Sequence, residues 1–176
     1  ASDVTVYDID NHQIVTSDLL SSESSFETFP TFSPDGTSLY FCSSKAVAPM
    51  PERYRDARYS LCRIDFDPED CTFGSSVDTL YNADVKGGSV SFPRISPDGR
   101  YLVFTLGGYG NFSIWHKDAD LYMIDLQDGT VMPMHHLNSD DVESYHSWSS
   151  DSRWLVFSSR RDDGLYTKPY IAFIDA

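Results

Sequence analysis

Cationic and aromatic residues gather in four irregular stretches of this 176-residue chain, residues 43–60, 106–119, 137–147 and 158–169. These stretches hold eight of the 13 lysines and arginines. Arginine beside tyrosine or tryptophan is typical of surfaces that bind proteins or peptides. An aromatic ring beside an amide or a carboxylate can also bind a sugar. The candidate binding residues are Arg55, Arg58, Tyr109, Asn111, Trp115, His116, His146, Arg160, Arg161, Asp162 and Tyr166.

Any one of these side chains could instead only pack its own loop or balance the charge of a neighbouring aspartate. The prediction of a binding site therefore depends on their grouping in space. That grouping must come from the regular elements that carry the four stretches.

The sequence lacks the usual motifs of catalysis and of metal binding. It contains no GxSxG, HExxH, P-loop or GxGxxG motif, so we expect no enzymatic activity in this chain. The histidines show no spacing of metal ligands, and we expect neither a metal nor a cofactor. Cys42, Cys62 and Cys71 are predicted to be free thiols, with a Cys62–Cys71 disulfide as the alternative.

The net charge of −14 argues against nucleic acid or an anionic membrane as a partner. The chain has no apolar run long enough to span a membrane. We therefore expect a protein, a peptide or a glycan as the partner. The chain starts at Ala1 without a charged and then apolar leader, and we expect a mature or excised part of a protein.

One short motif occurs three times along the chain. It reads FSPDGTSLYF at 32–41, ISPDGRYLVF at 95–104 and WSSDSRWLVF at 148–157. Proline, aspartate and glycine suit a tight turn, and the residues that follow are strand formers. The third copy has Ser152 at the glycine position, where a positive φ costs a non-glycine residue about 1 kcal/mol.

Strands that end in aspartate recur between the turns, for example SLCRIDFD at 60–67 and DLYMIDLQDG at 120–129. The repeating unit is then a meander of four short strands. We predict an all-β fold, a β-propeller segment of about three to four four-stranded antiparallel blades. Almost no helix is expected outside the stretch 43–60, where a helical turn is possible at 51–57. The predicted divisions are the end of one blade at 1–24, blades at 25–88 and 89–140, and a partial blade at 141–176.

A meander alternates its connections between two ends of the sheet. The SPDG turns should therefore lie at one end, and the four cationic and aromatic stretches should lie together at the other. Loops on a rigid scaffold commonly carry function.

The repeated turn and the aspartate-ended strand resemble the TolB-type, WD-repeat-like β-propeller repeat. The segment SYHSWSSDSRWLVFSSRRDDG is similar to uncharacterised TolB-like envelope proteins of Bacteroidetes. The resemblance implies a non-enzymatic binding or scaffold propeller in the periplasm or at the outer membrane of a Gram-negative bacterium. Propellers have about 4–8 blades, so we expect a larger propeller or self-association through open blade edges.

Two other functions stay open at this point. The chain could be the gating propeller of a serine oligopeptidase whose catalytic domain lies outside these residues. It could also be a lectin-like propeller that binds carbohydrate.

Overall fold

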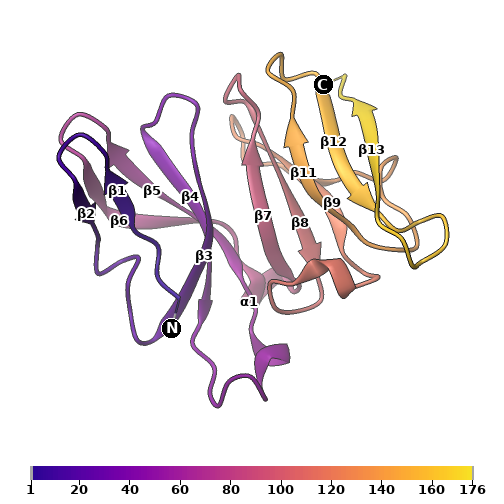
Figure 1. Ribbon diagram of the computed structural model, residues 1–176, viewed down its shortest axis with the longest axis horizontal. Coiled ribbons are helices and arrows are strands. Elements are labelled where there is room, and N and C mark those ends of the chain that lie inside the picture. Colours follow the sequence, from indigo (N-terminus) through magenta and orange to yellow (C-terminus); the bar gives the residue numbers. More distant parts are fainter. Residues whose placement is uncertain (1, 176) are drawn as a thin grey trace.

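The computed structural model describes residues 2–175, which form four antiparallel sheets that follow one another in chain order (Figure 1). Each sheet is a meander of sequential strands, so the predicted all-β fold is confirmed. The strands are β1 (Val6–Asp8) and β2 (Gln13–Val15); β3 (Ser25–Phe32), β4 (Ser38–Lys45), β5 (Ser60–Asp67) and β6 (Thr72–Tyr81); β7 (Ser89–Ile95), β8 (Tyr101–Gly107), β9 (Asp120–Asp125) and β10 (Val131–Pro133); and β11 (Glu143–Trp148), β12 (Trp154–Ser159) and β13 (Lys168–Phe173).

Helical structure is limited to short turns. One 3-10 turn at Tyr54–Asp56 lies within the predicted range 51–57. A single helical turn α1 (Ala83–Lys86) and a second 3-10 turn at Ser113–Trp115 fall outside the stretch 43–60. Asn82 caps α1 because its side chain accepts a hydrogen bond from the Asp84 amide.

The sheets pack face to face, and the alternation of side chains along each strand supplies both faces. Leu39 and Phe41 of β4 face the first hairpin, and Tyr40 and Cys42 face the third sheet. Phe104 of β8, in the third sheet, is fully buried where that sheet packs against the second sheet. Burial on both faces explains why the strands after the turns read as continuous apolar runs.

The first strands of the three larger sheets, β3, β7 and β11, lie side by side, and each carries a bulge. In each bulge an aromatic residue has a positive φ: Phe29 at 53°, Phe92 at 53° and Tyr145 at 50°. Their rings form a row, with centroid distances of 4.3 Å and 4.5 Å. A left-handed backbone costs a non-glycine residue about 1–2 kcal/mol. The bulge turns each ring toward the neighbouring first strand, and this contact offsets that cost.

A backbone hydrogen bond recurs where each first strand meets the preceding repeat. Glu27 N donates to Ser2 O at 2.7 Å, and Val90 N donates to Tyr59 O at 2.8 Å. In the same way, Glu143 N donates to Ala119 O at 2.7 Å. The acceptors lie outside the strands, and Tyr59 and Ala119 directly precede β5 and β9. Each bond joins a first strand to the preceding repeat, so the relation between neighbouring sheets is set by a directional contact as well as by apolar packing.

The fourth sheet has an exposed outer face. Val156 lies five residues after the turn aspartate, as do Tyr40 and Val103 in the earlier sheets. Tyr40 and Val103 are covered by the following sheet and are 7% and 0% exposed, whereas Val156 is 43% exposed. The repeat therefore ends with one face of its last sheet open.

The three cysteines are free thiols, as predicted, and the alternative Cys62–Cys71 disulfide is not formed. Cys42 and Cys62 are buried. Burial raises the pKa of the Cys62 thiol to about 11.

The three turns share one backbone conformation. Gly36, Gly99 and Ser152 have φ values of 74°, 77° and 60°, so the positive φ predicted for Ser152 is confirmed. In each turn a serine hydroxyl donates to the turn aspartate at 2.5 Å. These bonds lower the pKa of each aspartate. Ser152 also accepts a hydrogen bond from Asp98 N at 3.0 Å, which links two neighbouring turns.

Because of this link, Ser152→Gly has two opposing effects on stability. Glycine relieves about 1 kcal/mol of backbone strain, but it also removes a hydrogen bond of about 1 kcal/mol. We expect Ser152→Gly to change the free energy of unfolding by less than about 0.5 kcal/mol, and Ser152→Ala to lower it by about 1 kcal/mol. Urea denaturation of both variants measures this. Equal destabilisation by glycine and alanine would show that the turn is not strained at this position.

Candidate functional site

The connections between strands separate into two groups at opposite ends of the sheets. The long connections 46–59, 108–119 and 160–167 leave one end, together with the connection 134–142. We call this end the loop face. The loops contact one another: Gly110 N donates to Ala57 O at 2.9 Å, and Arg160 donates to Ile114 O at 3.3 Å. Strand order alone thus brings three stretches far apart in sequence onto one surface.

Tyr109 is the centre of the first cluster on the loop face. Its ring centroid lies 5.8 Å from that of Tyr54 and 4.2 Å from that of His116. The Arg55 guanidinium lies 5.6 Å and 5.7 Å from the two tyrosine ring centroids, within range of a cation–π contact. Arg55 Nε also donates to Tyr54 Oη at 3.0 Å, and this bond lowers the pKa of Tyr54. Partial burial lowers the pKa of His116.

Tyr54, Tyr109 and His116 border a cavity of about 310 Å³. Its other walls include Met50, Pro51, Asn111 and Phe112. The walls are largely apolar, and Arg55 adds a positive charge beside them. An apolar group next to an anionic group is the chemistry that fits this place.

Trp115 forms a second cluster with Arg160. The Trp115 side chain is 76% exposed, and the Arg160 guanidinium lies 5.4 Å from its ring. Arg160 also donates to the carbonyl of Gly164, which fixes the neighbouring loop. Leu165 and Tyr166 of that loop are exposed as well. Two loops therefore present large apolar side chains beside one guanidinium.

Three other predicted residues hold the loops in place. Arg161 pairs with the buried Glu143 at 3.1 Å, and its guanidinium lies 4.6 Å from the Tyr170 ring centroid. Arg58 donates to the carbonyl oxygens of Arg55 and Ala57. Asp162 accepts hydrogen bonds from Lys168 at 2.7 Å and from the Tyr170 hydroxyl at 2.8 Å. These groups are engaged within the chain.

His146 does not reach the loop face. The sequence places it in the connection 137–147, but β11 starts at Glu143 and includes it. It is 3% exposed, and Nε2 donates to Val103 O at 2.8 Å. Burial lowers the pKa of His146 to about 4. His146 is therefore neutral near pH 7, and its hydrogen bond joins the third and fourth sheets.

The lowered pKa predicts a dependence of stability on pH. The folded-state pKa of about 4 lies below the unfolded value of 6.5, so the contribution of neutral His146 is complete above pH 6.5 and is lost as the pH falls toward 4. The full loss is roughly 3 kcal/mol. Urea denaturation from pH 7 to 4.5 should show a smaller loss for His146→Gln than for the parent, because glutamine keeps an N–H donor and does not titrate in this range. Parallel pH curves for the two proteins would contradict this account.

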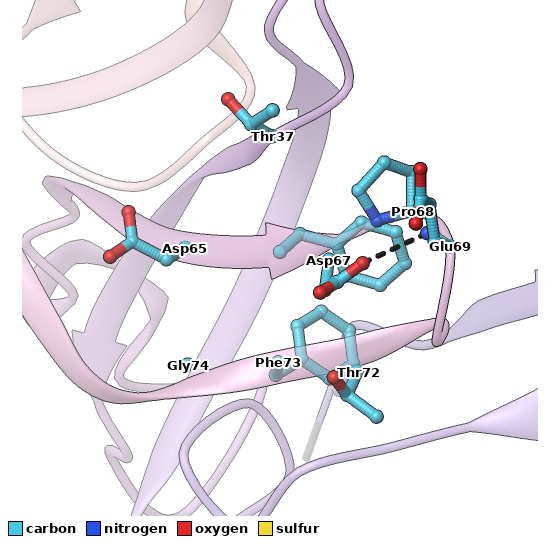
Figure 2. A pocket seen from close by; sticks show the side chains of 9 residues that line it. Thr37, Asp65, Asp67, Pro68, Glu69, Thr72, Phe73 and Gly74 are labelled. Atoms are coloured by element: carbon cyan, nitrogen blue, oxygen red, sulfur yellow. Dashed lines mark hydrogen bonds between the residues drawn. The ribbon is translucent and has the colours of Figure 1, made fainter.

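A second cavity lies at the opposite end, around the turn between β5 and β6, and has a volume of about 480 Å³ (Figure 2). Asp65 and Asp67 contribute carboxylates to it. Asp65 pairs with Arg63 at 2.6 Å, and Asp67 accepts from the Glu69 amide at 2.9 Å. Within residues 2–175 no group of three or more His, Cys, Asp and Glu side chains could hold a metal ion. We assign no ligand to this cavity.

The sheets, their side-by-side first strands and the repeated contacts between them define the fold class, an antiparallel β-propeller segment. Among the described residues no helix has the length and apolar character needed to cross a membrane.

Solved structures of the same fold are similar to this chain at low sequence identity. A puromycin-hydrolyzing peptidase of Mycobacterium tuberculosis has a TM-score of 0.60 at 16% identity, over 87% of this chain and 22% of its own. An oligogalacturonate lyase in complex with manganese has a TM-score of 0.57 at 17% identity, over 97% of this chain and 41% of its own. Prolyl oligopeptidase B from Galerina marginata has a TM-score of 0.54 at 12% identity, over 94% of this chain and 23% of its own.

These similarities support the propeller fold alone. The chain spans between 22% and 41% of the proteins just described. No protein-family model and no curated protein sequence matches the chain.

Proposed function

We propose that the chain is part of a non-enzymatic propeller that binds a protein or a peptide through its loop face. The observation that carries this proposal is the gathering of exposed apolar side chains around guanidinium groups. Arg55 and Arg160 both lie over aromatic rings. In the described part of the chain neither forms an ion pair with a carboxylate. Arg55 stays available to an anionic group on a partner. Arg160 donates to the carbonyls of Ile114 and Gly164, and it adds a positive charge to the same surface.

The composition of the loop face favours a peptide over a glycan. Phe112 and Leu165 are exposed beside Trp115, and such side chains match apolar side chains of a partner. A sugar-binding site would place hydrogen-bonding groups around the ring, but Asp162 is engaged with Lys168 and Tyr170. The partner that fits best has aromatic or aliphatic residues next to a carboxylate. We place this binding in the envelope of a Gram-negative bacterium, on the resemblance of the repeats to TolB-type sequences.

A second candidate is the propeller of a serine oligopeptidase. It is favoured by the similarity in fold to two peptidases, the puromycin-hydrolyzing enzyme and prolyl oligopeptidase B. The catalytic serine would then lie in a hydrolase domain outside these residues. A GxSxG motif directly after a predicted strand in the flanking sequence of the parent gene would favour this candidate.

The open face of the fourth sheet is a second place for association. Trp154, Val156 and Ile171 are exposed there, and the equivalent faces of the second and third sheets are covered by a further sheet. We propose that a sheet of the same repeat covers this face as well.

Selection of a random peptide library on the immobilised chain tests the binding of peptides. We expect enriched peptides that combine apolar and acidic residues. The double variant Phe112→Ala/Trp115→Ala should bind a synthetic enriched peptide at least about tenfold more weakly in fluorescence polarisation, as expected for central aromatic contacts. Arg55→Gln should weaken binding of the same peptide and lower its dependence on salt.

The matched control is Ile9→Ala. Ile9 is 74% exposed and lies in the connection between β1 and β2, away from the loop face. Its substitution should leave the affinity unchanged. Peptides that bind the parent and the Phe112→Ala/Trp115→Ala variant equally would show that the loop face is not the binding site.

A further inference from the structure

The third sheet and the start of the connection 134–142 carry a group of side chains outside the Tyr109 and Trp115 clusters. Three of the four methionines, Met123, Met132 and Met134, line one cavity of about 400 Å³. His135 and His136 line the same cavity. The group comes largely from one segment, VMPMHH at 131–136.

Strand pairing brings the three thioethers together. Met123 of β9 lies directly opposite Met132 of β10, and opposite residues of an antiparallel pair project from the same face. Met134 follows Met132 by two positions and continues the ladder, because its amide donates to Leu121 O at 3.0 Å. Alternation along a strand places Met134 on the face of Met132.

Methionine often fills gaps in an apolar core, and Met123 and Met134 do pack partly against the cluster that contains Leu121 and Leu155. Two features go beyond packing. All three methionines are only partly buried. The two histidines next to them are exposed, so imidazole nitrogens and thioether sulfurs border the same open cavity.

This set of donors is selective. Thioether sulfur is a soft ligand that selects Cu(I), and imidazole also binds copper, whereas carboxylates and carbonyls suit Mg²⁺ and Ca²⁺. The described residues offer no group of three harder ligands. We propose that Met123, Met132 and Met134 bind one Cu(I) ion, with His135 or His136 as a nitrogen ligand. Methionine side chains are unbranched and flexible, so small rotamer changes bring their sulfurs to one ion.

Methyl NMR of the chain labelled with ¹³C at the methionine methyl groups tests the site, with Ag(I) as a soft monovalent probe that does not change oxidation state. The background is Cys71→Ser, because Cys71 is a free, partly exposed thiol that would compete for the ion. Single Met→Leu variants assign the four signals. We expect the signals of Met123, Met132 and Met134 to shift together and to saturate at one Ag(I) per chain. Absent shifts, or shifts of Met50 alone, would overturn the proposal.

Competition with bicinchoninate measures the affinity for Cu(I) itself under anaerobic conditions. Met132→Leu/Met134→Leu keeps the side-chain volume and should weaken Cu(I) binding by more than about tenfold. Met50→Leu, in the loop 46–59, is the matched control and should bind as the parent does. If the double leucine variant fails to fold, His135→Gln/His136→Gln gives the same test with exposed side chains. Parent affinity in the folded double variant would contradict the proposed ligands.

Discussion

The contacts that each first strand makes with the preceding repeat determine the arrangement of this molecule. Strand hydrogen bonds stay within each sheet, and apolar packing between sheets has no preferred direction. The bond from Val90 N to Tyr59 O, with its counterparts at Glu27 and Glu143, supplies a direction at each contact. The row of Phe29, Phe92 and Tyr145 rings adds an aromatic contact between the second and third sheets and between the third and fourth sheets. Three residues with a strained backbone at equivalent positions indicate that the fold depends on this contact.

The loop face follows from that arrangement. Because neighbouring sheets are fixed relative to each other, loops from successive sheets meet. Tyr109 in the loop 108–119 can therefore contact Tyr54 in the loop 46–59. Arg161 and Glu143 then hold the loops of the fourth sheet. The residues divide into those that stabilise the surface, such as Arg58 and Arg161, and those that are presented on it, such as Trp115. The proposed copper site lies on the edge strand β10 and the start of the connection 134–142, and it shares no residue with the Tyr109 and Trp115 clusters.

Most of what could be predicted from the sequence rests on the repeated turn motif. Proline, aspartate and glycine specify backbone angles locally, so the turns and the positive φ of Ser152 could be inferred from residue types. The end of the sheet from which each loop leaves follows from counting strands. The bulges could not be predicted, because an aromatic residue with positive φ contradicts its own propensity and is retained only through a contact with the next sheet. In the sequence, the only sign of two of these bulges is a Phe-Pro pair, at 29–30 and at 92–93.

His146 and the methionines show two other limits of the sequence. The boundary of β11 decides whether His146 is a loop residue or a buried one, and boundaries are set by pairing with β12 rather than by local preference. The shared face of Met123 and Met132 depends on the register of β9 and β10. Register depends on which face is buried and on the turn between the strands. The sequence shows Met132, Met134 and the two histidines in one segment, but spacing along the chain could not reveal that Met123 joins them.

Native-state hydrogen exchange of the Val90 amide tests the central contact most directly. Val90 lies near the start of β7, next to the connection from α1, where an amide bonded only within its own sheet would exchange through local fraying. Because this amide donates to Tyr59 O, directly before β5 of the neighbouring sheet, it should exchange as slowly as the most protected amides of β8. An exchange rate similar to that of Lys117 in the loop 108–119 would show that the sheets are not joined by this bond.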